Sequence, residues 1–85
     1  MGYDRKYGHV TLENREIPDD EGLIVFRYRD AETPAVMERY LELCEQADSP
    51  EHHLALIRET IADVQAWQDE HRDRVVTPTS NALLG

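Results

Sequence analysis

The sequence predicts a single small α+β domain, in which a short β-hairpin packs on an antiparallel two-helix hairpin and an extended C-terminal tail follows. Four apolar residues recur at alternating spacings of three and four, as on one side of an α-helix: Leu54, Ile57, Ile61 and Val64. The segment 33–47 carries a matching apolar stripe, and residues 23–29 are rich in β-branched and aromatic side chains. A chain of 85 residues has room for one thin core.

Two segments separated by a loop predict the β-hairpin. Residues 9–12 (H-V-T-L) alternate between polar and apolar, and residues 23–29 (L-I-V-F-R-Y-R) form the stronger strand. A period of two turns one set of the second strand toward the helices: Ile24, Phe26 and Tyr28. The loop 13–22 is rich in turn-forming residues, and residues 1–8, which contain two glycines, are expected to be irregular.

Two Ser/Thr-Pro pairs mark the expected helix starts. Thr33-Pro34 opens a helix over 33–47, and Ser49-Pro50 opens a second over 49–73, with Thr33 and Ser49 as N-caps. The short junction makes the helices antiparallel neighbours. The first helix is expected to turn one apolar stripe to its partner: Val36, Met37, Tyr40, Leu41 and Cys44. In the uncharged tail 75–85, Val75 and Val76 are expected to dock, and the placement of Leu83 and Leu84 stays open.

Charge and composition restrict the function. Eighteen acidic and nine basic residues give a net charge of −9, which argues against binding nucleic acid or an anionic membrane. No run of about 18 apolar residues could span a bilayer, so the cytoplasm is the expected compartment. The single cysteine and four scattered histidines show no zinc spacing, and no phosphate-loop or hydrolase motif is present. We therefore expect no enzyme, no catalytic residue, no metal and no cofactor, and a protein partner with a basic or neutral surface.

Two surfaces are candidates for that partner. An acidic cluster in the loop could steer a basic protein: Glu13, Glu16, Asp19, Asp20 and Glu21. The simpler interpretation is a solvated turn. Leu56 and Trp67 lie beside the helical stripe and could begin a second apolar surface, since tryptophan often anchors interfaces. The simpler interpretation is that Trp67 covers the core against Phe26 or Tyr28.

Two other functions remain open. Arg27 and Arg29 share one face of the predicted strand at a separation of about 7 Å, which suits a nucleotide or phosphate. The simpler interpretation, favoured in so acidic a chain, is that they pair with acidic residues of the loop. A self-associating structural component, for example a homodimer formed through the sheet edge or the Trp67 surface, is the other alternative.

Several short strings in the chain resemble small uncharacterised proteins encoded by phages and prophages of actinobacteria. They are I-P-D-D-E-G-L-I-V-F-R-Y-R-D, Leu43-Cys44, S-P-E-H-H-L, Ala66-Trp67-Gln68 and Thr77-Pro78, within about residues 7–79. The resemblance implies a phage accessory protein that acts inside the bacterial host, and it carries no catalytic or binding residue to this chain. Tyr28 departs from the F-R-A-x-D pattern that such proteins more often have.

Overall fold

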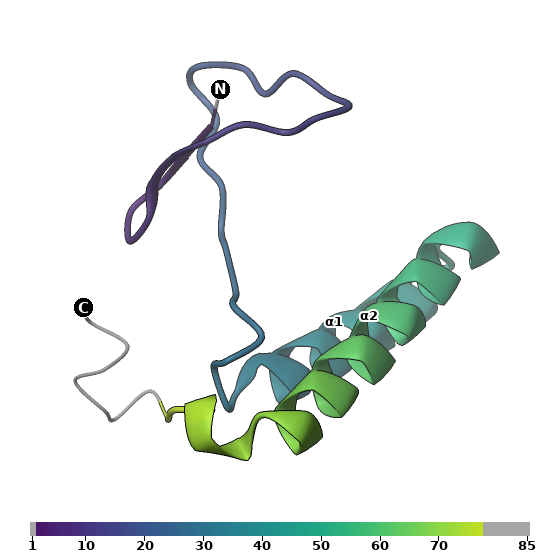
Figure 1. The fold of residues 1–85 in the computed structure, drawn as a ribbon. Helices are drawn as coiled ribbons and strands as arrows, with labels where there is room; N and C mark the ends of the chain where they lie inside the picture. Colours follow the sequence, from purple (N-terminus) through teal and green to yellow (C-terminus); the bar gives the residue numbers. More distant parts are fainter. Residues whose placement is uncertain (1, 78–85) are drawn as a thin grey trace.

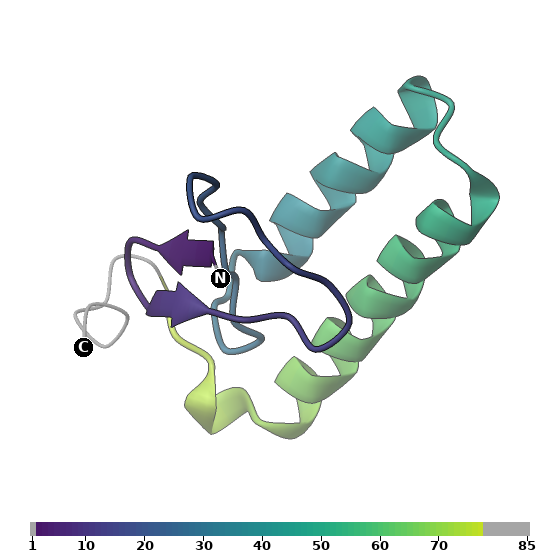
Figure 2. The same ribbon diagram turned by 90° about the horizontal axis from the view of Figure 1, so that it is seen from above.

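The computed structural model describes residues 2–77 and has an α+β architecture. Figure 1 shows a β-hairpin at one side and an antiparallel pair of helices at the other, and Figure 2 shows the two helices side by side. The elements in chain order are β1 (Gly2–Asp4), β2 (Gly8–Val10), α1 (Thr33–Gln46), α2 (Glu51–Glu70) and the 3-10 turn η1 (Arg72–Arg74).

The seam between α1 and α2 forms the main core. Ile57 and Ile61 of α2 pack with Cys44 of α1, and Val64 is fully buried. This confirms the stripe predicted for the second helix. The six extra residues of α2 add about 9 Å at a rise of 1.5 Å per residue, so its last turns extend past the start of α1. The rest of the seam comes from Met37, Leu41 and Leu54.

The turn between the helices is closed by backbone groups. Asp48 has a left-handed φ of 57°, its N–H donates to the Glu45 carbonyl (3.1 Å), and the Ser49 N–H donates to the Cys44 carbonyl (3.0 Å). These two bonds satisfy the last carbonyls of α1 in the pattern of a Schellman motif. Pro50 then occupies the N-cap position of α2 without a side-chain cap. The predicted Ser49 cap was therefore wrong, because the motif that ends α1 already fixes Ser49.

The start of α1 also differs from the predicted cap. Glu32 is the N-cap residue, Thr33 is the first helical residue and no side-chain cap hydrogen bond forms. The buried Thr33 hydroxyl donates instead to the Arg27 carbonyl (2.8 Å), and the Asp30 carboxylate accepts the Glu32 N–H (2.8 Å). Thr33 thus ties the helix to the segment before it.

The β-hairpin pairs residues that the sequence did not pair. Tyr3 lies opposite His9 and Asp4 opposite Gly8, so the first strand comes from the segment expected to be irregular. The predicted strand over 9–12 is present as Gly8–Val10, but its partner is not 23–29. Gly8 has a φ of +86°, which glycine adopts readily, and this permits the tight reversal after Asp4.

Residues 23–29 do not form the predicted strand. Just before this segment, Gly22 forms an isolated parallel bridge with Tyr3 of β1, where the Leu23 N–H donates to the Tyr3 carbonyl (3.0 Å). Beyond it, the Val25 N–H donates to Asp4 Oδ2 (2.9 Å), so a side-chain carboxylate replaces the next backbone partner. The pairing ends there because a ladder needs consecutive backbone partners.

The faces of this segment are also reversed. Ile24 is 81% exposed, and Phe26 and Tyr28 are exposed as well, whereas Leu23 is half-buried. Leu23 packs closely on Gly2, since a Cβ placed on Gly2 would lie only 2.7 Å from Leu23 Cγ. The expectation that this face packs on the helices was therefore wrong for Ile24 and Phe26, since the hairpin, with Ile17, takes the opposite side of the segment. Tyr28 does meet a helix, because its ring lies edge-on to Trp67 of α2 (6.5 Å between centroids).

Three segments meet where the chain enters α1 and leaves α2, and within residues 2–77 neither strand contacts a helix directly (Figure 1). Gln68 of α2 donates from Nε2 to the carbonyls of Tyr28 (2.8 Å) and Asp30 (2.9 Å). The Val76 N–H donates to the Arg29 carbonyl (2.9 Å), and Val75 and Val76 are half-buried as predicted. We call residues 28–31, 67–71 and 75–76 the junction. Leu83 and Leu84 lie outside the described residues.

Candidate functional site

The acidic side chains of the loop are solvated, although Ile17 between them is buried. The five predicted partner-binding carboxylates are exposed, and three of them line a shallow hollow of about 350 Å³ beside Tyr3 and Arg5: Asp19, Asp20 and Glu21. Within residues 2–77, no three His, Cys, Asp or Glu side chains are placed to hold a metal ion. Glu13 and Glu16 do not line the hollow, so the cluster is split between two parts of the loop.

Leu56 and Trp67 do not form one patch. Eleven residues of helix separate them by about 16 Å along α2. Leu56 is 59% exposed, whereas Trp67 is half-buried in the junction. The Trp67 ring stacks on His71 (4.4 Å between centroids), meets Tyr28 edge-on (6.5 Å) and lies 5.0 Å from the Arg74 guanidinium. The contact with Tyr28 agrees with the simpler interpretation of Trp67 as a packing residue.

Arg27 and Arg29 do not share a strand face. The Asp30 N–H donates to the Arg27 carbonyl (3.1 Å), which makes residues 27–30 a turn. Arg27 is exposed, and Arg29 is half-buried where its carbonyl pairs with Val76. The anionic-ligand function stays a prediction, without the strand geometry from which it was derived.

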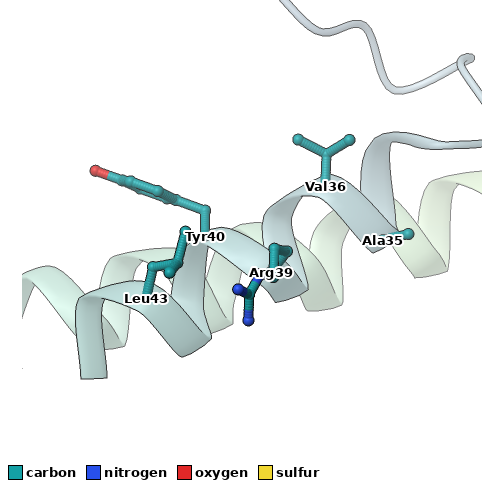
Figure 3. Close-up of a pocket in the computed structure, with 5 residues that line it drawn as sticks. All are labelled: Ala35, Val36, Arg39, Tyr40 and Leu43. Atoms are coloured by element: carbon teal, nitrogen blue, oxygen red, sulfur yellow. The ribbon is translucent and has the colours of Figure 1, made fainter. Parts of the chain in front are cut away.

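An apolar surface on α1 was missed by the sequence reasoning. Val36, Tyr40 and Leu43 are 37%, 46% and 45% exposed. Figure 3 shows them projecting from one side of α1, where with Ala35 and Arg39 they line an apolar hollow of about 470 Å³. We call these five residues the α1 outer face. Their spacing of four and three keeps the three large side chains in one row along the helix.

The sequence did contain a signal for this surface. Apolar residues occur in adjacent pairs at 36–37, 40–41 and 43–44, which makes the stripe wider than one partner helix can cover. Met37, Leu41 and Cys44 turn inward to α2, and the other member of each pair turns outward. The prediction wrongly placed Val36 and Tyr40 in the inner stripe and did not include Leu43.

Two residues of the α1 outer face, Arg39 and Tyr40, make polar contacts with neighbouring side chains. The Arg39 guanidinium pairs with the Glu42 carboxylate one turn along the helix (2.9 Å). The Tyr40 hydroxyl lies 3.3 Å from His53 Nε2 on α2, and the two rings meet edge-on at 6.0 Å. The hydrogen bond with the Cys44 thiol, the charge of that thiol's ionised form and burial raise the pKa of the Tyr40 hydroxyl above its usual 10. Tyr40 is therefore neutral at physiological pH and suited to contact rather than to catalysis.

One buried carboxylate organises the hairpin. Asp4 Oδ1 accepts the N–H groups of Lys6 and Tyr7 (2.8 Å each), and Oδ2 accepts that of Val25 (2.9 Å). The bond from Tyr7, with those from Lys6 and Val25, holds the pKa of the Asp4 carboxyl below its usual 3.8, although burial acts in the opposite direction. With every oxygen engaged by backbone, Asp4 has a structural role.

Comparison with known proteins adds no assignment. No family model, curated protein or solved structure matches the chain. Among residues 2–77, neither helix has the length and apolar character needed to cross a bilayer.

Proposed function

We propose that this chain is a non-enzymatic protein-binding protein whose α1 outer face contacts a partner protein. The observation that carries the proposal is a row of three large apolar side chains, each more than a third exposed, beside an apolar hollow: Val36, Tyr40 and Leu43. Scattered apolar side chains are common on protein surfaces, but contiguous apolar patches mark interaction sites. A neutral tyrosine in such a patch is a typical anchor of protein interfaces.

The resemblance to phage and prophage proteins supports a setting for this function. A small acidic accessory protein would act in the cytoplasm of an actinobacterial host and bind a host or phage protein there. The acidic loop 13–21 fits the same proposal, because exposed carboxylates accelerate the approach of a basic partner without forming the final contact.

A pull-down from an actinobacterial lysate tests the α1 outer face. The full chain should retain a partner in about equal amount, and the double variant Val36→Ser/Leu43→Ser should lose it. Ile24→Ser is the matched control, since Ile24 is a more exposed apolar residue outside the helical pair. Because all three positions are exposed, circular dichroism should show unchanged helix content in both variants.

Two results would contradict the proposal. The first is a partner retained by the double variant, which would place the contact elsewhere, for example at Leu56 or the acidic loop. The second is the absence of any partner together with a dimer in sedimentation velocity that the double variant abolishes. That result would make the chain a self-associating component.

A further inference from the structure

The stretch 21–27 is extended and has one unpaired backbone edge, on its way from the hairpin to the helical pair (Figure 1). The N–H groups of Leu23 and Val25 point to the hairpin, where they donate to a carbonyl and a carboxylate of β1 (3.0 and 2.9 Å). Backbone groups of an extended chain alternate between its two edges, so those of Ile24 and Phe26 point away from β1. Among residues 2–77, the backbone groups of Ile24 and Phe26 form no hydrogen bond.

The side chains beside this free edge are those of a paired strand. Ile24 is 81% exposed and Phe26 is 47% exposed, and both belong to the β-branched and aromatic run that predicted a strand. A row of unpaired N–H and C=O groups is a template for a further strand, because each group gains a backbone partner there. The ligand that satisfies this edge is therefore another extended chain.

The charges at the two ends of the stretch are complementary to those of a second copy. Glu21 lies at one end and Arg27 at the other, both side chains are exposed, and neither forms an ion pair within residues 2–77. When two copies run antiparallel with Ile24 at the centre, each Glu21 lies opposite the Arg27 of the other copy, whereas a parallel pair sets like charges side by side. Residues 21–27 carry no net charge, so the paired stretches do not repel although the chain carries −9.

We infer that two copies of the chain form a dimer by antiparallel pairing of residues 21–27, an interaction beyond the protein-binding function proposed above. The two-fold axis passes beside Ile24, whose N–H and C=O groups bond with those of Ile24 in the second copy. Gly22 then pairs with Phe26, and the aromatic ring covers the glycine, which has no side chain of its own. The α1 outer face takes no part in this contact, so the dimer presents it twice.

Sedimentation equilibrium of the full chain tests the pairing. Between about 10 µM and 1 mM the chain should pass from monomer to dimer, because so short a strand pair buries less area than a stable dimer needs. Phe26→Pro should abolish the dimer, since it removes an N–H that the monomer does not use. Val36→Ser/Leu43→Ser is the control on α1 and should leave the dissociation constant within about twofold of that of the unchanged chain.

Charge reversal tests the register. Arg27→Glu should weaken the dimer roughly tenfold, because two-fold symmetry sets like charges opposite each other twice. Arg15→Glu changes the net charge equally in the exposed loop and should weaken the dimer by less than about threefold. Glu21→Arg/Arg27→Glu exchanges the two charges and should return the dissociation constant to within about twofold of its original value.

Several results would overturn the inference. A chain that stays monomeric up to about 1 mM does not pair in this way. A dimer that persists in a folded Phe26→Pro variant, or that Val36→Ser/Leu43→Ser breaks, has its contact elsewhere. Equal effects of Arg27→Glu and Arg15→Glu, or a double reversal that binds no tighter than the single one, exclude the antiparallel register. Because the reversed residues are exposed, these variants decide the question even where the proline variant does not fold.

Discussion

Replacing Ile57 by alanine should remove a large part of the stability of the helical pair. Ile57 is 4% exposed and packs against Cys44, Leu54 and Ile61. The substitution deletes three carbon atoms, which corresponds to about 2.4 kcal/mol at 0.8 kcal/mol per buried group. A residual cavity adds to this cost, because thin cores relax only in part, so we expect a loss of about 3 kcal/mol. For a domain of this size the melting temperature should fall by roughly 12–24 °C.

The neighbouring residue provides the control. Leu56 is 59% exposed one position earlier on α2, so Leu56→Ala should change the free energy of unfolding by less than about 0.5 kcal/mol. Urea denaturation followed by circular dichroism at 222 nm measures both variants, since the helices dominate that signal. Equal losses for the two variants, or a loss below about 1 kcal/mol for Ile57→Ala, would refute the argument that the seam is the core.

Two further predictions concern backbone geometry and pH. Because the pKa of Asp4 is lowered on folding, its contribution to hairpin stability is complete above the unfolded pKa near 3.8 and is lost as pH falls through the lower folded value. An NMR titration of the Val25 amide should have its midpoint below 3.8, and a midpoint at or above 3.8 would contradict this. Asp48→Gly should raise the stability by about 1 kcal/mol, because the left-handed φ of 57° costs glycine little, whereas Asp48→Ala should lower it. A thermal melt in which the glycine variant is the less stable would disprove this reading.

The helical pair could be predicted because its signals are local. The Thr33-Pro34 and Ser49-Pro50 pairs and the three-four spacing on α2 each lie within a few residues, and they located both helices to within about three residues. The caps were wrong because the Thr33 hydroxyl donates to the Arg27 carbonyl outside the helix, and because the Ser49 N–H belongs to the turn that ends α1, so that Pro50 takes the N-cap position of α2.

The segment 9–12 was predicted as a strand and is present as Gly8–Val10, but the strand pairing could not be predicted because pairing is not local. Residues 23–29 have the composition of a strand, but Asp4, about twenty residues earlier, supplies the acceptor that ends their pairing. The strand at Gly2–Asp4 has no strand-like composition and exists because Gly8 permits the reversal. The α1 outer face was missed for a related reason: the sequence shows how wide an apolar stripe is, and only the position of α2 shows which half is covered.

Among residues 2–77, neither β1 nor β2 contacts a helix, and the chain over 11–32 links the hairpin to the helical pair, which divides the protein into two units of unequal cooperativity. Native-state amide exchange should therefore occur in two tiers, with the amides of Leu54 to Val64 opening only on global unfolding and those of β1 and β2 opening at a lower free energy. A destabilising substitution inside the hairpin would then lower the stability of the hairpin and leave that of the helical pair unchanged. The surface around Tyr3 and the acidic loop can thus diverge between relatives without disturbing the helix that presents Val36, Tyr40 and Leu43.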